Sequence, residues 1–148
     1  MDQPHLYRVA LENEGPKGGT LRSPDSLPPL PVASPPQFGG PPGVWSPEHL
    51  FVASVASCLM TTFRAIAEMS GLDIVEYTDS ASGKLVKGDD SLYSITEVTL
   101  RPRIVIADPR HVGKAERLIE KAERACLISR SVAAEIHLEP EVIVAVPV

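Results

Sequence analysis

Two cysteines, Cys58 and Cys126, carry the side chains of this 148-residue sequence that are best suited to covalent chemistry. The plainest interpretation is that both are small core residues, which is how unpaired cysteine usually behaves. The alternative is a redox pair. One thiolate attacks the O–O bond of a peroxide and becomes a sulfenic acid, and a second nearby thiol condenses with it to form a disulfide.

Other cysteine chemistry fits the sequence less well. There is no CxxC motif, and the histidines are scattered rather than spaced as ligands, so no metal site is predicted: His5, His49, His111 and His137. A nucleophilic thiol of the protease type needs a histidine base in contact with it. His49 lies nine residues before Cys58 in the same predicted helix, about two and a half turns away. That separation excludes direct contact.

A redox role for Cys58 requires its thiolate form. Cys58 lies in the middle of an apolar helix, where the helix N-terminus lends little positive potential and burial raises a thiol pKa. We therefore expect a cation close to the sulfur. Glu48 lies ten residues earlier, about 15 Å along the helix axis, too far to contact Cys58. It can instead orient an arginine or lysine that reaches between them, or simply be a carboxylate favoured by the helix N-terminus.

The helix that carries Cys58 is predicted over residues 46–72. Ser46 is a suitable N-cap, Pro47 suits the first turn, and Gly71 is a typical C-terminal stop. The residues from 50 to 60 are apolar or small on every face, so the helix is expected to be buried in a core, a subunit interface or a membrane. Its Ser, Thr, Arg and Glu residues make it a poor membrane span.

A second helix is predicted over residues 108–131, beginning with Asp108 as cap and Pro109 in the first turn. Apolar residues recur at the i, i+3, i+4, i+7 spacing of an amphipathic helix. Cys126 falls on the same inward stripe as Leu118 and Ala122. We therefore expect the second thiol to be buried on this helix.

The remaining ordered segments are predicted to be strands. They are an N-terminal hairpin of residues 5–12 and 20–23, an edge strand at 30–33 in a proline-dense stretch, a strand at 73–77 continuing at 84–86 after a bulge at 82–83, a long strand at 92–106 bent at Pro102, and a last strand at 134–146 broken near Pro140. Antiparallel hairpins with two helices between them indicate an α+β fold, with the helices on one face of the sheet.

The length favours a single domain of residues 1–148, because too little chain precedes the proline-dense stretch to form a separate domain. Its parts are the N-terminal hairpin and proline-rich loop at 1–45, the first helix at 46–72, a hairpin at 73–107, the second helix at 108–131, and a C-terminal strand at 132–148.

Composition narrows the functional classes. Apolar residues make up 43% of the chain, as in a folded protein, and the net charge of −5 gives no basic footprint for nucleic acid. The opening MDQPHLYRVALENEG lacks the pattern of a signal peptide. We expect a cytoplasmic protein with no membrane partner, in which the cysteines are reduced thiols or redox catalysts rather than structural disulfides.

The segment PPQFGGPPGVWSPEHLFVASVASC carries a Pro-x-x-x-Gly-Gly loop at residues 35–40, the pair Pro47-Glu48, and Cys58 ten residues after that glutamate. This pattern resembles the signature of the OsmC/Ohr family of thiol peroxidases. The segment ERACLISRSV, which contains Cys126, resembles the second-cysteine segment of uncharacterised OsmC-like proteins more than the Cys-Pro form of typical Ohr proteins. The resemblance runs from about residue 30 to residue 146.

The resemblance implies an intertwined homodimer, with antiparallel sheets wrapped around two long central helices and two active sites at the subunit interface. It implies that Cys58 is the peroxidatic cysteine and Cys126 the resolving cysteine, which form a Cys58–Cys126 disulfide. It also implies that Glu48 orients an arginine against the Cys58 thiolate.

In function, the resemblance implies an antioxidant enzyme of the oxidative stress response. Such a peroxidase reduces organic or fatty-acid hydroperoxides to alcohols. Its reductant would be a dithiol, carried by a lipoyl protein in the better-known members, and no metal or flavin cofactor is implied.

One departure concerns the activating cation. The family places an arginine in a Gly-Arg-x-Gly turn of the N-terminal hairpin, whereas this sequence has Gly-Pro-Lys-Gly-Gly at residues 15–19. Lys17 or Arg22 is therefore expected to take that role, although lysine lacks the planar fork of arginine. The same departure supports an alternative function, a non-catalytic OsmC-like dimer that binds an apolar ligand at the subunit interface.

Overall fold

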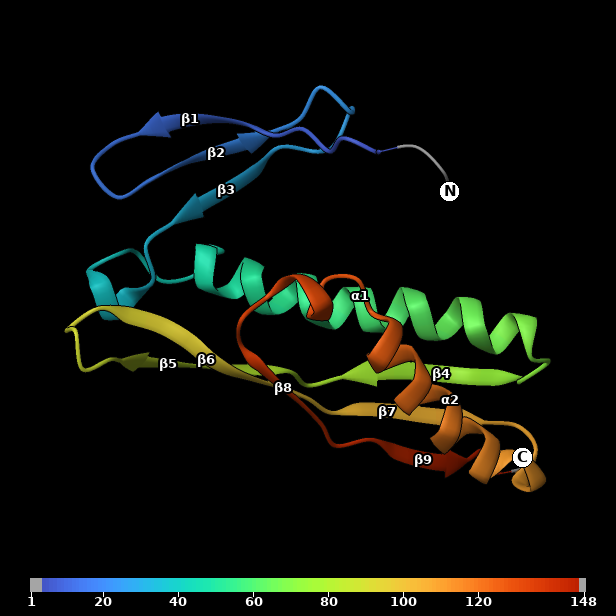
Figure 1. Cartoon of the computed structure of the whole chain (residues 1–148). Helices are drawn as coiled ribbons and strands as arrows, with labels where there is room; N and C mark the ends of the chain where they lie inside the picture. Colours follow the sequence, from blue (N-terminus) through green and yellow to red (C-terminus); the bar gives the residue numbers. More distant parts are fainter. Residues whose placement is uncertain (1–3, 147–148) are drawn as a thin grey trace. The chain divides into compact units, whose positions relative to one another are not determined.

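The computed structural model describes residues 4–146. The chain forms two compact units, the first ending at Leu50 and the second beginning at Phe51. Helix α1 (Pro47–Met69) begins in the first unit and continues through the second. Figure 1 labels the strands and the two long helices in chain order.

The first unit contains a three-stranded antiparallel sheet in the order β1-β2-β3, with β1 at Ala10–Glu14, β2 at Gly18–Arg22 and β3 at Leu30–Ala33. The predicted hairpin and the predicted edge strand are thereby confirmed, although the first strand begins later than expected. The turn between β1 and β2 places Gly15 at a φ of 70°. The Asn13 side chain donates to the carbonyls of Gly15 and Gly18, at 3.0 and 2.8 Å, and so fixes this turn.

The ends of α1 follow the predicted capping residues. The His49 N–H donates to the Ser46 hydroxyl at 3.1 Å, as expected for an N-cap. At the other end Gly71 has a φ of 68°. The Leu72 N–H then reaches the Ala67 carbonyl at 2.9 Å, the six-to-one bond of a Schellman motif. The predicted 46–72 helix is confirmed, with its last helical residue at Met69.

The second unit contains two antiparallel pairs of strands, and one further strand joins each pair. The strands are β4 (Ile74–Asp79), β5 (Ser82–Lys87), β6 (Tyr93–Leu100), β7 (Pro102–Ile106), β8 (Glu135–Leu138) and β9 (Glu141–Val144). They form two three-stranded sheets, β4-β7-β9 and β5-β6-β8. The hairpin pairs are antiparallel, whereas β8 joins β6 and β9 joins β7 in parallel. The α+β class is confirmed, and the sheets, which were expected to be antiparallel, also contain these two parallel pairs.

The long strand predicted at 92–106 is two strands, divided at Arg101. The Arg101 N–H leaves the ladder and donates to Asp79 Oδ1 at 2.8 Å, and Pro102 beside it has no N–H to offer. The segments predicted as one bulged strand also separate, because β4 and β5 lie in different sheets. The register shifts lie between Ile74 and Glu76 and between Lys84 and Leu85, not at 82–83.

The second long helix, α2, covers Val112–Ala125 and is shorter than the predicted 108–131. A 3₁₀ turn at Pro109–His111 precedes it, with Asp108 accepting from the Arg110 N–H as predicted for a cap. The helix ends because Cys126 is extended, with a ψ of 114°. Cys126 therefore lies just beyond the helix, at the start of a tight turn, rather than within its last turns.

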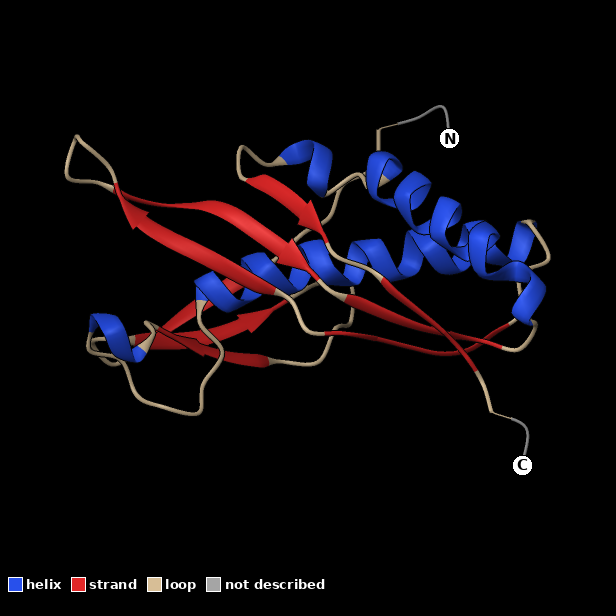
Figure 2. Ribbon diagram, turned by 90° about the horizontal axis from the view of Figure 1, so that it is seen from below, coloured by secondary structure: helices blue, strands red, loops and turns tan. Residues whose placement is uncertain are grey.

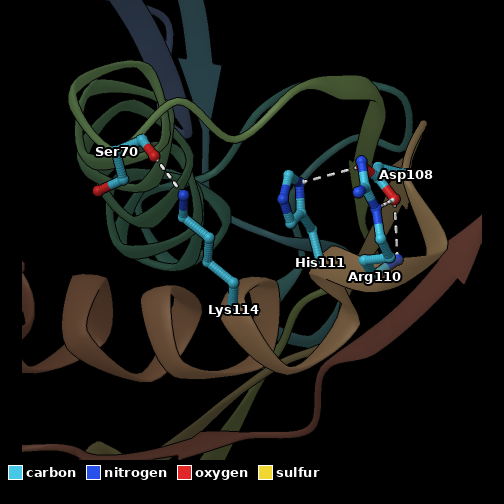
Figure 3. Close-up of polar contacts among 5 residues, drawn as sticks. All are labelled: Ser70, Asp108, Arg110, His111 and Lys114. Carbon is cyan, nitrogen blue, oxygen red and sulfur yellow. Dashed lines mark hydrogen bonds and ion pairs between the residues drawn. The ribbon is translucent and has the colours of Figure 1, made fainter.

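The core of the second unit joins both helices to the sheets. Its fully buried larger side chains come from α1, β6, β7 and α2: Val55, Leu59, Phe63, Val98, Leu100, Ile104, Ile106 and Ile119. Figures 1 and 2 both show α2 beside the C-terminal part of α1. Lys114 of α2 donates to the Ser70 carbonyl at the end of α1, as Figure 3 shows. This contact places a cation at the negative end of the α1 dipole.

Candidate functional site

Cys58 lies in the middle of α1, one turn before Thr62 on the same face. Its side chain is half-buried, and its Sγ lies 3.9 Å from the Thr62 Oγ1. Leu59 and Phe63, on the adjacent stripe of the helix, are fully buried and fix its rotation in the core. The helix therefore holds the Cys58 thiol at the edge of the core rather than at its centre.

Cys126 is the first residue after α2, and its side chain is fully buried. Its N–H donates to the Glu123 carbonyl at 3.2 Å, which closes the helix. The chain then turns so tightly that the Arg130 N–H reaches the Cys126 carbonyl at 3.1 Å. This turn places the Cys126 thiol near enough to the Cys58 thiol for each to shift the pKa of the other, and both cysteines are free.

The two thiols have opposite pKa shifts. Burial raises the pKa of Cys58, but donors around the sulfur outweigh it: the Cys126 thiol, the Ile128 N–H, the Thr62 hydroxyl and the Leu127 N–H. The net pKa of Cys58 lies below its ordinary value. The pKa of Cys126 is raised, first by burial and then by Cys58. Cys58 is thus the thiol that ionises, and Cys126 is the one that stays protonated and donates to it.

This electrostatic arrangement differs from the sequence expectation for Cys58. Burial alone was expected to raise its pKa, so that a side-chain cation would be needed to form the thiolate. Within the second unit, neutral donors lower the pKa instead, and two of them are backbone amides of the turn that follows Cys126. Hydrogen bonds to the charged form of a group favour that form, as a cation would.

The other predicted site residues, Glu48, Lys17 and Arg22, belong to the first unit. Glu48 lies in the first turn of α1, and its Oε2 is buried without a hydrogen-bond partner in the described part of the chain. Arg22 faces Glu12, with 3.9 Å between Arg22 Nε and Glu12 Oε1, and both side chains are largely exposed. Among residues 4–146, neither Lys17 nor Arg22 forms an ion pair with Glu48.

Lys17 lines a cleft of about 290 Å³ in the first unit. The cleft lies between the β1–β2 hairpin and β3, and its wall also includes Leu11, Val32 and Pro47. Pro47 is the residue before Glu48. The structure therefore places the predicted lysine in an apolar hollow that reaches the start of α1.

Several groups around the thiol pair were not predicted from the sequence. The contact of Thr62 with Cys58 could have been predicted, because Thr62 lies four residues after Cys58 in a predicted helix. Nothing in the sequence indicated the amides of Leu127 and Ile128, because both residues were predicted to lie within the second helix. Tyr77 of β4 was missed as well. Its buried hydroxyl lacks a hydrogen-bond partner within the described residues, and its pKa is raised by burial and then by Asp79 and Cys126.

A family model for OsmC-like protein matches residues 40–141, which is more than half of the chain and includes Glu48 and both cysteines. The chain belongs to the OsmC-like family. The match runs from the loop before α1 to the start of β9. The family membership inferred from the sequence motifs is therefore confirmed.

Individual OsmC-like proteins show the same relationship. The chain is 26% identical over 113 residues to the uncharacterised protein YmaD of Bacillus subtilis, covering 74% of this chain and 75% of YmaD. It is similar to the OsmC-like protein VCA0330 of Vibrio cholerae, with a TM-score of 0.85 and 23% identity over 93% of this chain and 99% of the other. A Legionella pneumophila structure described as an organic hydroperoxide resistance protein OsmC has a TM-score of 0.74 and 24% identity, over 95% and 99% of the two chains. These structures confirm the fold.

Proposed function

We propose that this OsmC-like protein is a thiol peroxidase that reduces organic or fatty-acid hydroperoxides to alcohols. The observation that carries the proposal is the contact between Cys58 and Cys126, with the pKa lowered on one thiol and raised on the other. Two inert core cysteines would not need donors gathered around one sulfur. Several structures with this fold are described as organic hydroperoxide resistance proteins, which supports the same chemistry here.

The first step is attack of the Cys58 thiolate on one oxygen of the hydroperoxide. The S–O bond forms as the O–O bond breaks, the sulfur is oxidised to sulfenic acid, and the departing alkoxide takes a proton to become the alcohol. The amides of Leu127 and Ile128 hold the thiolate in its reactive form before the attack.

The second step is resolution by Cys126. Its sulfur attacks the Cys58 sulfenic acid, the S–S bond forms, and the hydroxyl leaves as water with the proton that Cys126 gives up. A dithiol then reduces the disulfide by exchange and becomes a disulfide itself. A reducing compartment such as the cytoplasm, with a lipoyl protein as dithiol carrier, would sustain the cycle.

The same proposal includes a homodimer. By its length and composition alone, helix α1 could cross a membrane. Only 22% of its most apolar stretch is buried within the chain. A helix that is apolar on every face is buried in a core, an interface or a membrane, and the Ser, Thr, Arg and Glu residues of α1 make it a poor membrane span. A second copy of the chain therefore best explains what covers the remaining apolar surface. Met60 and Met69, exposed by 39% and 87%, would be covered in that dimer. Light scattering coupled to gel filtration measures the mass directly.

The decisive experiment is a thiol titration after peroxide treatment. The reduced wild-type protein is mixed with one equivalent of cumene hydroperoxide, and both free thiols should disappear with formation of an intramolecular disulfide. In Cys58→Ser, peroxide consumption should be abolished. A wild-type protein whose two thiols remain titratable after treatment overturns the proposal.

A further inference from the structure

Three side chains of the kinds that bind metal ions converge on the β5-β6-β8 sheet, away from the cysteines. Glu97 lies on β6, and Glu135 and His137 lie on β8. The parallel register pairs Glu97 with Glu135 and Thr99 with His137. Residues two apart in a strand face the same side of the sheet, so the glutamate and the histidine of β8 point the same way. Glu97 joins them on that face from the neighbouring strand.

The distances between these side chains fit a small cation. His137 Nε2 lies 2.9 Å from Glu97 Oε1 and 4.0 Å from Glu135 Oε2. One ligand atom from each residue lies within 4.8 Å of the others. In a tetrahedral zinc site with metal–ligand bonds of about 2.1 Å, ligand atoms lie about 3.4 Å apart. The two histidine distances bracket that value, and Glu135, whose side chain is 72% exposed, can adjust by rotation.

The charges around the three residues also favour a cation. Glu97 and Glu135 each bring a carboxylate to the imidazole of His137. Lys84 Nζ lies 3.4 Å from Glu97 Oε2 and leaves Oε1 directed at the histidine. Two carboxylates and one lysine leave a net negative charge beside the imidazole of His137. One imidazole with carboxylates suits Zn²⁺ and its first-row neighbours better than Ca²⁺, which takes six to eight oxygens.

We propose that Glu97, Glu135 and His137 bind one divalent transition-metal ion on this sheet, with the remaining coordination filled by water. The ion would join β8 to β6 and so fasten the segment that follows Cys126 to the hairpin. Binding is independent of the proposed peroxidase function, because neither cysteine is a ligand. The site escapes sequence reading because Glu97 and His137 lie forty residues apart and meet only through the parallel pairing.

The test is a zinc titration of the EDTA-treated, dialysed protein in competition with a chromophoric chelator. We expect saturable binding of one Zn²⁺ per chain. Loss of a ligand should weaken binding by at least about tenfold in Glu135→Gln and in His137→Ala, the scale set by supporting residues of metal sites. The matched control is Glu139→Gln, which removes the same charge just after β8. Glu139 pairs with Arg101 instead, at 3.4 Å.

Three outcomes overturn the assignment. They are no saturable binding by the wild type, an equal loss of affinity in Glu139→Gln, and unchanged affinity in both ligand variants. Co²⁺ serves as a second probe, because a sulfur-to-cobalt charge-transfer band would mean that the thiols hold the metal. Zn²⁺ should also raise the melting temperature of the wild type and of Glu139→Gln, but not of His137→Ala. Circular dichroism of each variant verifies its fold before titration.

Discussion

Cys58 and Cys126 shift each other's ionisation: the pKa of Cys58 is lowered by donors of which the Cys126 thiol is the first, and the pKa of Cys126 is raised, first by burial and then by Cys58. One sulfur is thus prepared to be a nucleophile and the other to remain protonated until it is needed. The pKa values of the two thiols shift in opposite directions because the thiols lie in different surroundings. Cys58 faces the amides of the turn after α2, whereas Cys126 is buried at the beginning of that turn.

Iodoacetamide should alkylate the two thiols over different pH ranges. Because the folded pKa of Cys58 is lowered, its reactivity should rise with pH and reach half of its maximum at a lower pH than that of a free thiol. Cys126 should react only at a higher pH than a free thiol, or after unfolding. Mass spectrometry of peptides alkylated at each pH identifies the residue. A half-point for Cys58 at or above the free-thiol value contradicts the assignment.

Thr62→Val should raise the pKa of Cys58 and slow its reaction at neutral pH. The hydroxyl, 3.9 Å from the sulfur, contributes one hydrogen bond, worth at most about 1 kcal/mol. The pKa should rise by less than about one unit, and the rate should fall by less than about tenfold. Thr61→Val is the matched control, since the Thr61 hydroxyl donates to the Cys58 carbonyl at 3.1 Å and not to its sulfur.

Cys126→Ser should stop the cycle after its first step. Serine keeps a donor near Cys58, so one equivalent of peroxide should still be consumed, but no second thiol can form the disulfide. The Cys58 sulfenic acid should accumulate and react with dimedone, which adds a mass detectable on the Cys58 peptide. Sustained turnover by this variant with a dithiol would show that Cys126 is not the resolving cysteine.

Lys114→Met should destabilise the second unit without changing the thiols. The lysine donates to the Ser70 carbonyl at the end of α1, a charged hydrogen bond at a helix C-terminus that contributes about 1 kcal/mol. Urea unfolding measures the loss. Lys121→Met is the control, because Lys121 is exposed on the same helix. An equal loss in both variants would point to helix propensity or net charge instead.

Gly71→Ala should destabilise the protein by about 1 kcal/mol, because a side chain in the left-handed region strains the backbone. Gly71 has a φ of 68°, and an added Cβ meets no atom within 4 Å, so backbone strain accounts for the whole effect. Gly113→Ala, within α2, makes the same change at an exposed helical position and should stabilise the protein by up to about 1 kcal/mol. Thermal unfolding of both variants tests the opposite signs.

Local patterns determined much of this OsmC-like fold. The cap at Ser46, the stop at Gly71 and the apolar stripe of the second helix each depend on neighbours within a few residues. The first helix, the hairpin strands and the breaks near prolines could therefore be located from the sequence. The motifs that surround Cys58 also sufficed to identify the family.

Tertiary structure decided what acts on the thiol. Helix α2 ends at Ala125 although its amphipathic pattern continues, because Cys126 takes an extended conformation that no local signal requires. The turn that follows brings the amides of Leu127 and Ile128 to Cys58, where they help to lower its pKa. The parallel pairing of β8 with β6, and with it the cluster of Glu97 and His137, likewise depends on contacts between distant segments. Residue types fixed which groups are present, and long-range packing fixed which of them meet.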